Sequence, residues 1–179
     1  MMRPALLVVD LQAVTLGNAR TTTPDELLAR VSTLLARFRD DGLPVVHIVS
    51  TGTPPGRTSY SVGARTWTDE QAEIAEPVRP VGGEPVLRRA AWSGFAATDL
   101  DVRLRGLGVE SVVIAGLATP FGIESTARDA YDLGYSVAVV SDAVAGPDVA
   151  GHDWTLQRVV PALGRVLTTA EVAARETAD

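Results

Sequence analysis

The stretch "TPFGIESTARDAYDLGY", residues 119–135, raises a question of chemistry because it follows an apolar run typical of a buried strand. The turn between a strand and a helix is where many α/β enzymes place a nucleophile. Glycine stands at that position here, as Gly122. Gly122 serves either the geometry of a helix start or the close approach of a substrate to backbone N–H groups at the positive end of the helix.

A carboxylate and two guanidinium groups end two other predicted strands. Asp10 closes "ALLVVD", where it either caps a helix, pairs with an arginine or, with a pKa raised by burial, donates a proton. Arg88 and Arg89 end "EPVLRR", and alternation along a strand allows one to point inward, unless both are solvated surface charges. An inward arginine would lower the pKa of Asp10 or hold an anionic substrate by a bidentate contact.

Composition excludes several chemistries. The chain has no cysteine, so disulfides, thiolate metal sites and a cysteine nucleophile are absent. All 16 basic residues are arginine, which excludes a lysine base or Schiff base. The only imidazoles are His47 and His152, too few for a multi-histidine metal cluster. The net charge of −6 disfavours nucleic acid or an anionic membrane as a partner.

Other polar and aromatic candidates have structural alternatives. No histidine stands at a recognisable triad spacing from the hydroxyl candidates, so we interpret these as caps or helix-face residues: Ser93, Ser125 and Thr126. His47 lies inside a predicted strand and favours a core position. Three aromatic side chains could form the wall of a pocket or pack in the core: Trp67, Trp92 and Phe95.

Alternating strand and helix patterns predict one α/β domain over residues 1–179, with three layers and a central six-stranded, mostly parallel sheet covered by helices on both faces. We expect strands at 5–10, 43–49, 84–89, 111–117, 136–142 and 165–169. We expect helices at 24–41 with Thr23 as N-cap, at 69–75, at 99–108 with Thr98 as cap, at 119–135, at 152–163 and at 170–179. Residues 50–67 should form a long surface loop.

Ligands of such sheets bind beyond the carboxyl ends of the strands, near the point where strand order reverses. We therefore expect Asp10, Arg88 or Arg89, and residues 117–122 to converge, with the first and fourth strands as neighbours. No run approaches the ~20 apolar residues needed to span a bilayer, which favours a cytoplasmic protein.

Four segments together resemble the isochorismatase-like hydrolases, also called the cysteine hydrolase superfamily: "LLVVDLQ", "RAAWSGFAATDL", "VVIAGLAT" and "ESTARDAYDLGYSVAVVSDA". The resemblance implies that Asp10 is the catalytic aspartate, that Arg89 stands at the place of a catalytic lysine, and that Gly122 stands at the place of the cysteine. It also implies a cis peptide at Leu117–Ala118 or Ala118–Thr119. Isochorismatases resemble this chain in having glycine at the cysteine place, and there the aspartate protonates a vinyl ether.

The resemblance leaves two functions open. One is an acid-catalysed hydrolase of a small polar or anionic metabolite, without a thioester, in which Asp10 is the acid; the other is a catalytically inactive member that binds a small molecule or serves a structural role. We expect substrate contacts from Gln12, Trp67, Trp92, Phe95, Ala118, Thr119 and Phe121. We expect no cofactor and no metal, and the resemblance implies a homodimer or larger homo-oligomer.

Overall fold

The computed structural model describes residues 2–59 and 63–174. Its central sheet has six strands in the order β5-β2-β1-β6-β7-β8, and every neighbouring pair is parallel. The strands are β1 (Pro4–Val9), β2 (Val45–Ser50), β5 (Val86–Arg89), β6 (Ser111–Leu117), β7 (Ser136–Ala145) and β8 (Gly164–Leu167). This confirms the predicted six-stranded α/β fold.

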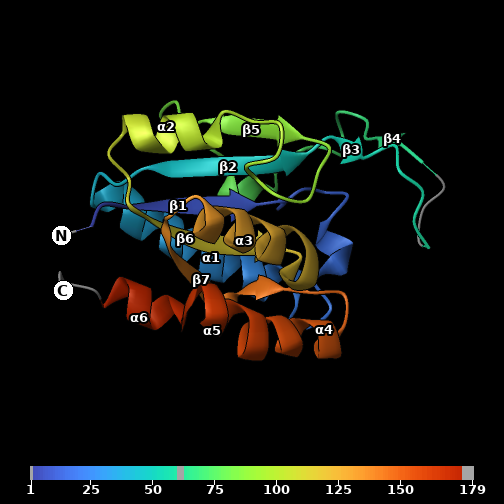
Figure 1. Ribbon diagram of the computed structural model, residues 1–179. Coiled ribbons are helices and arrows are strands. Elements are labelled where there is room, and N and C mark those ends of the chain that lie inside the picture. The colour runs from blue at the N-terminus through green and yellow to red at the C-terminus, as the bar shows by residue number, and fades with distance from the viewer. Residues whose placement is uncertain (1, 60–62, 175–179) are drawn as a thin grey trace.

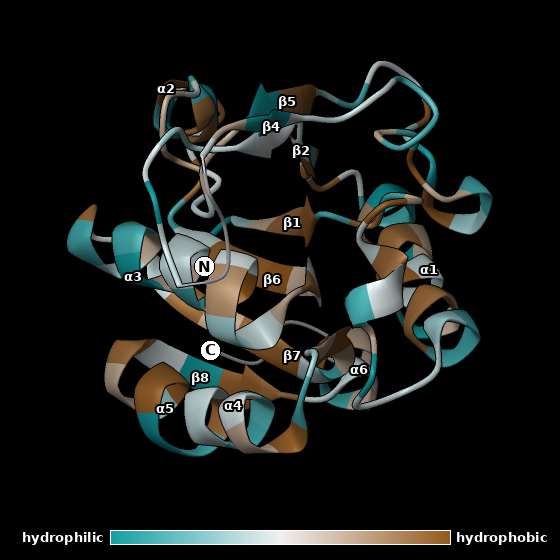
Figure 2. Ribbon diagram, turned by 90° about the vertical axis from the view of Figure 1, so that its right-hand side faces the viewer, coloured by the Kyte–Doolittle hydropathy of each residue, from teal (hydrophilic) through white to brown (hydrophobic). Residues whose placement is uncertain are grey.

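Helices cover both faces of the sheet, as Figures 1 and 2 show. One face is covered by α1 (Pro24–Asp40) and α6 (Thr169–Ala173), which pack on the side of β1 that carries Leu6 and Val8. The other face is covered by α2 (Leu100–Gly106), α3 (Glu124–Asp132) and α5 (Val160–Leu163), which pack on Leu7 and Val9. The alternation of side chains along β1 therefore divides the core into two apolar layers.

Helix α1 has the boundaries that its sequence predicts. The Thr23 hydroxyl accepts a hydrogen bond from Glu26 N at 3.2 Å, and Glu26 Oε2 accepts one from Thr23 N at 3.2 Å, which is a capping box. Gly42, with φ of +64°, allows the chain to turn out of the helix. Between these ends, one face of α1 is buried against the sheet: Leu27, Leu28, Val31, Leu34, Leu35 and Phe38.

The segment between β2 and β5 differs from its prediction. Residues 69–72 form a turn instead of a helix, and Ile74 pairs with Gln12 in an isolated antiparallel bridge. A 3-10 turn, η2 (Glu76–Val78), follows. The predicted loop at 50–67 contains a small hairpin of β3 (Gly52–Thr53) and β4 (Arg65–Thr66). The predicted helix was wrong because the Gln12 side chain ties this segment to the end of β1: Gln12 Nε2 donates to Ala72 O at 2.9 Å.

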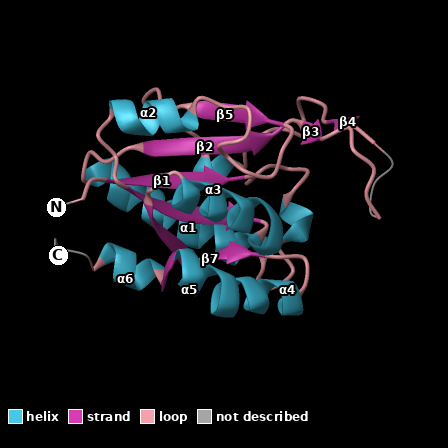
Figure 3. Cartoon of the chain, in the orientation of Figure 1, coloured by secondary structure: helices cyan, strands magenta, loops and turns pink. Residues whose placement is uncertain are grey.

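Several other boundaries shift by a few residues, three of them for identifiable local reasons, and Figure 3 shows these three elements. Strand β7 runs past residue 142 because an irregularity in its register with β6 absorbs the extra residues. The helix predicted to begin at His152 begins at Val149 in α4 (Val149–Trp154), because Asp148 Oδ1 accepts from Gly151 N at 2.8 Å. Asp99, not Thr98, is the N-cap of α2. The predicted closing helix runs partly into residues 175–179, which lie outside the described range.

Two helical segments have the wider π geometry. One is η3 (Thr119–Ile123), which follows β6 and leads into α3. The other is η4 (Thr155–Val159), which joins α4 to α5. Short π segments within helices occur frequently at functional sites.

The order of the sheet reverses between β1 and β6, which are neighbours as predicted. Gly116 of β6 has φ of +118°, and a Cβ there would lie 2.0 Å from Val9 O, so only glycine permits this close approach of the two strands. The end of β1 and the turn after β6 are thereby held together at the carboxyl edge. In the described part of the chain, no helix has both the length and the apolar character that crossing a membrane requires.

Candidate functional site

Asp10 and Arg89 meet at the carboxyl ends of β1 and β5 and form a bidentate ion pair. Arg89 Nη1 donates to Asp10 Oδ1 at 2.7 Å, and Arg89 Nη2 donates to Asp10 Oδ2 at 2.8 Å. Arg89 Nη2 also donates to Trp92 O at 2.8 Å. Arg88 is exposed, so Arg89 is the inward-facing arginine, as counting back from Phe95 implied.

The two side chains of the ion pair differ in their exposure to solvent. The Arg89 side chain is 0% exposed, whereas the Asp10 side chain is 12% exposed. A small molecule can therefore reach the carboxylate but not the guanidinium in this conformation. Arg89 Nε is also buried and has no hydrogen-bond partner in the structure.

Two opposing effects act on the Asp10 carboxyl. Burial raises the pKa of Asp10, while the hydrogen bonds and the positive charge of Arg89 lower it, and burial is the stronger influence. Asp10 also has φ of +51°, a conformation that aspartate tolerates better than most residues. The backbone at Asp10 is held by its amide, which donates to Ile48 O at 2.9 Å, and by the Thr15 hydroxyl, which donates to Asp10 O.

Gly122 lies in η3 and faces Asp10. A Cβ at Gly122 would lie 3.3 Å from Asp10 Oδ2 and 2.9 Å from Leu117 O. The position at which the resemblance implied a thiol in related enzymes is thus directly beside the accessible carboxylate, and here it holds no side chain. The backbone is drawn in tightly enough that even a methyl group would require a shift.

The turn that carries Gly122 begins with a cis peptide at Leu117–Ala118, one of the two bonds that the resemblance implied. Ala118 O accepts hydrogen bonds from Phe121 N at 2.9 Å and from Ile123 N at 3.2 Å. These bonds fold residues 118–123 into the π segment that directs Gly122 toward β1. Ala118 and Thr119 are both buried in this turn.

Thr126 connects the Gly122 turn to the loop after β5. Its hydroxyl donates to Gly122 O at 2.6 Å and accepts from Gly94 N at 2.9 Å. Thr126 is fully buried, so this hydroxyl is occupied by the backbone on both sides. Thr126 is therefore a helix-face residue that positions the site, as its sequence interpretation favoured. Ser93 has a comparable role, because its Oγ accepts from Phe95 N at 3.1 Å.

Sequence reasoning did not find the partner of Thr119. Thr119 Oγ1 and His152 Nδ1 are 2.8 Å apart, although 33 positions separate the two residues. Burial lowers the pKa of His152, which favours a neutral imidazole. Only the packing of α4 against η3 brings this pair together, so no local pattern in the sequence could have indicated it.

The predicted substrate contacts fall into two groups. Trp92 and Phe121 are in contact, with ring centroids 4.9 Å apart and the rings tilted by 44°. Trp92 is exposed, although its carbonyl accepts a hydrogen bond from Arg89. Phe95 instead stacks on Tyr135, with centroids 6.0 Å apart, and Tyr135 directly precedes β7 at the amino edge of the sheet. Phe95 therefore packs against the apolar layer on this face of the sheet, and its role as a substrate contact stays a prediction.

Gln12 and Trp67 are both bonded to Ser50 at the end of β2. Ser50 N donates to Gln12 Oε1 at 2.8 Å, and Gln12 Nε2 donates to Ser50 O at 2.9 Å. Trp67 Nε1 donates to Ser50 Oγ at 3.0 Å. Because Ser50 pairs with Arg89 in the sheet, both side chains stabilise the neighbourhood of the ion pair. The Gln12 amide has no exposed surface, and its role as a substrate contact stays a prediction.

Within residues 2–59 and 63–174, no three histidine, aspartate or glutamate side chains are grouped as metal ligands. The charged groups of the site are a single carboxylate and a guanidinium that already hydrogen-bonds to it. This arrangement can move one proton at Asp10, whose side chain keeps 12% of its surface exposed. It provides no nucleophilic thiol, because the chain has no cysteine.

The family model of the isochorismatase domain matches residues 4–171 of the chain. Among curated proteins, the chain is 29% identical to the uncharacterized isochorismatase family protein YecD of Escherichia coli, over 94% of this chain and 93% of that protein. It is 32% identical to maleamate amidohydrolase of Pseudomonas putida, over 93% and 83%. It is 34% identical to streptothricin hydrolase of Streptomyces noursei, over 81% of this chain but 50% of that protein.

Comparison with solved structures also finds an isochorismatase family protein. An isochorismatase family protein from Burkholderia thailandensis superposes with a TM-score of 0.91 at 31% identity, over 97% of this chain and 96% of that one. N-carbamoylsarcosine amidase from Thermoplasma acidophilum superposes with a TM-score of 0.76 at 32% identity, over 94% and 97%.

Proposed function

Because the chain belongs to the isochorismatase family, we propose that it hydrolyses a small polar or anionic metabolite by proton transfer at Asp10, without a thioester intermediate. The observation that carries the proposal is the Asp10 carboxyl, which keeps 12% of its side chain exposed and has only the glycine at position 122 beside its Oδ2. A substrate that reaches this exposed surface would contact the carboxyl group directly. Relatives named as hydrolases and amidohydrolases support hydrolysis as the general reaction.

Hydrolysis of a vinyl ether is the reaction that fits a proton donor without a nucleophile. The Asp10 carboxyl proton transfers to the terminal carbon of the C=C bond, whose π electrons form the new C–H bond. Water adds to the resulting oxocarbenium ion and returns a proton to the Asp10 carboxylate. The hemiketal then separates into a ketone and an alcohol. Asp10 is the only side chain that this sequence of steps requires to gain and lose a proton.

The environment of Asp10 supports its use as an acid. Burial raises the pKa of Asp10 above its ordinary value in spite of Arg89. A substrate seated beside Gly122 would cover the exposed 12% of the Asp10 side chain and remove its remaining water. That loss of solvent would raise the pKa of Asp10 further, so binding and protonation would favour each other.

Arg89 acts on this chemistry through Asp10. Its side chain is fully buried, so it is a positioning residue that fixes both carboxyl oxygens. An anionic substrate would contact Arg89 only if the guanidinium gave up one of its bonds to Asp10. Such an exchange would leave Asp10 without its counter-charge and would favour the protonated acid.

A second candidate is a family member that binds a small molecule without turnover. The bidentate ion pair favours it, because both oxygens of Asp10 accept hydrogen bonds from Arg89, which is the geometry of an ionised carboxylate. A buried ion pair of this kind also persists for structural reasons alone. Turnover measurements separate the two candidates.

The test is a screen of the wild-type chain against isochorismate and related enol ethers, with product release followed by chromatography. Under acid catalysis, kcat/KM falls as pH rises through the pKa of Asp10, and Asp10→Asn lowers kcat by ~10²–10⁴-fold. Circular dichroism of Asp10→Asn verifies that the fold is retained. If the wild type turns over none of these substrates, the binding function is the better account.

A further inference from the structure

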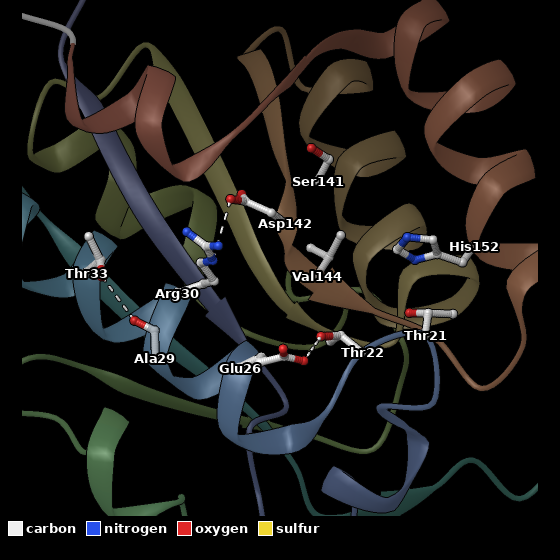
Figure 4. Close-up of a pocket in the computed structure, with 10 residues that line it drawn as sticks. All are labelled: Thr21, Thr22, Glu26, Ala29, Arg30, Thr33, Ser141, Asp142, Val144 and His152. Carbon is white, nitrogen blue, oxygen red and sulfur yellow. Dashed lines mark hydrogen bonds and ion pairs between the residues drawn. The ribbon is translucent and has the colours of Figure 1, made fainter.

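A cavity that does not include Asp10 opens between the start of α1, the end of β7 and α4, and Figure 4 shows its lining. Its volume is about 500 Å³, within the range of small-molecule sites. Val144 lies at its centre, with Arg30 and Asp142 on one side and the His152 imidazole on the other. Most of its lining residues are polar, which favours an occupant that forms hydrogen bonds.

Arg30 forms an ion pair with Asp142 but no hydrogen bond with its side chain in the described part of the chain. Its Nε lies 3.8 Å from Asp142 Oδ2, which is too long for a hydrogen bond. The Arg30 side chain is 57% exposed and its guanidinium reaches over the cavity from α1. Its planar set of N–H donors matches a carboxylate, which can accept two of them in parallel.

Two carboxylates flank Arg30, and each has one oxygen that accepts no hydrogen bond among the described residues. Asp142 Oδ1 accepts from Thr169 N at 2.7 Å and from Thr169 Oγ1 at 2.8 Å, which leaves Oδ2 toward the cavity. Glu26 Oε2 accepts from Thr22 Oγ1 at 3.0 Å and from Thr23 N at 3.2 Å, which leaves Oε1. The cavity therefore presents the negative charge of Glu26, the positive charge of Arg30 and the negative charge of Asp142 in that spatial order (Figure 4).

The opposite wall is formed by His152. The buried Thr119 Oγ1 lies 2.8 Å from His152 Nδ1, and if the hydroxyl donates this hydrogen bond, the proton of the neutral imidazole is on Nε2. Nε2–H is then a hydrogen-bond donor on the wall of the cavity. Thr21 adds a hydroxyl on the same side, and its Oγ1 already accepts from Gly146 N at 3.1 Å.

We propose that this cavity is a binding site for a small amino-acid zwitterion, whose carboxylate pairs with Arg30 and whose ammonium group lies between Glu26 and Asp142. The alternating charges are complementary to such a molecule. The ammonium group would offset the two carboxylates that flank Arg30, which a phosphate or a dicarboxylate cannot do, and a simple amine would give the Arg30 N–H groups no acceptor. Since it concerns a different part of the fold, the proposal does not depend on the hydrolysis proposed for Asp10.

His152 connects the cavity to the turn that carries Gly122, because it lines the cavity and contacts Thr119. Pro120 of this turn is packed between two glycines: a Cβ at Gly146 would lie 3.3 Å from Pro120 Cδ, and one at Gly151 would lie 3.4 Å from Pro120 Cγ. His152, which contacts Thr119, follows Gly151 directly. A ligand bonded to His152 Nε2–H would thus touch the residue that holds the start of η3.

The experiment titrates the full chain with L-lysine, which carries both a zwitterion and a second ammonium group, and follows the imidazole ¹H–¹⁵N resonances. The chain has only two histidines, and His47 is buried elsewhere in a contact with Glu84, so it is an internal reference. We expect the His152 resonances to shift and those of His47 to stay. Isothermal titration of Arg30→Gln should show at least about tenfold weaker binding, as expected for loss of a charge-assisted pair.

The matched control is Arg158→Gln, which removes one positive charge from an exposed position in η4 outside this cavity. It should bind L-lysine as the wild type does. Three results would overturn the proposal: no shift at His152, equal binding by Arg30→Gln and wild type, or binding of acetate, n-butylamine or inorganic phosphate as tightly as L-lysine.

Discussion

Replacing Arg89 with methionine tests whether the buried ion pair holds the candidate site together. The substitution preserves most of the side-chain volume but leaves the Asp10 carboxylate, with 12% of its side chain exposed, without its two hydrogen bonds of 2.7 and 2.8 Å. Removing one partner of a buried pair costs about 3–5 kcal/mol at neutral pH. That is a large part of the ~5–15 kcal/mol by which domains are typically stable.

The loss of stability in Arg89→Met should decrease as pH falls. Without Arg89, only burial acts strongly on Asp10, so the pKa of Asp10 in the folded variant rises further above 3.8. A carboxyl with a raised pKa in the folded state binds its proton more tightly there than in the unfolded chain. The variant is therefore penalised most at pH 7, and the penalty shrinks as pH falls toward the pKa of Asp10.

Urea denaturation of wild type and Arg89→Met at pH 7 and at pH 5 measures both effects. Arg88→Met is the matched control, because Arg88 is the exposed neighbour on the same strand and should change stability by less than about 0.5 kcal/mol. The double variant Asp10→Asn/Arg89→Met should recover part of the loss, since no charge remains buried. A loss below about 1 kcal/mol that does not change with pH would refute the reasoning.

Two further variants test other parts of the account. Gly122→Ala should lower the free energy of unfolding by about 1–3 kcal/mol in urea denaturation, because its Cβ would lie 2.9 Å from Leu117 O. The control Gly106→Ala, where a Cβ would have nothing within 4 Å, should be neutral or stabilising. Equal stability changes in the two variants would contradict the tight packing at Gly122. Burial raises the pKa of Glu84, but hydrogen bonds from Arg39 and His47 lower it to about 2 from 4.5. The ionised Glu84 therefore contributes roughly 3 kcal/mol at most to the free energy of unfolding. This contribution is present above pH 4.5 and is lost as pH falls toward 2. Glu84→Gln should abolish this part of the pH dependence of stability, which urea denaturation at several pH values measures.

Most of the fold could be predicted because its signals are local. The apolar runs of β1 and β6 and the capping box of α1 determine these elements without reference to distant residues. Because parallel sheets place their sites at the carboxyl edge, the meeting of Asp10, Arg89 and Gly122 also followed from the order of elements. The orientation of Arg89, rather than Arg88, depended on the resemblance and was confirmed by the ion pair.

Features that depend on contacts between distant segments could not be predicted. The turn at 69–72 forms where a helix was expected because the Gln12 side chain, 60 residues away from Ala72, bonds to its carbonyl. The pairing of Thr119 with His152 requires the packing of α4 on η3. Phe95 belongs to the helical layer because Tyr135, which is distant in sequence, offers a ring for stacking.

The most direct test of the central claim is the turnover of isochorismate by the wild type and by Asp10→Asn, with the reaction stopped at intervals and the intact protein weighed by mass spectrometry. We predict hydrolysis by the wild type, a loss of at least ~10²-fold in kcat for Asp10→Asn, and no covalent adduct at any time. Turnover by Asp10→Asn at the wild-type rate, or a substrate-derived adduct on the protein, would contradict the proposal that Asp10 catalyses hydrolysis by proton transfer alone.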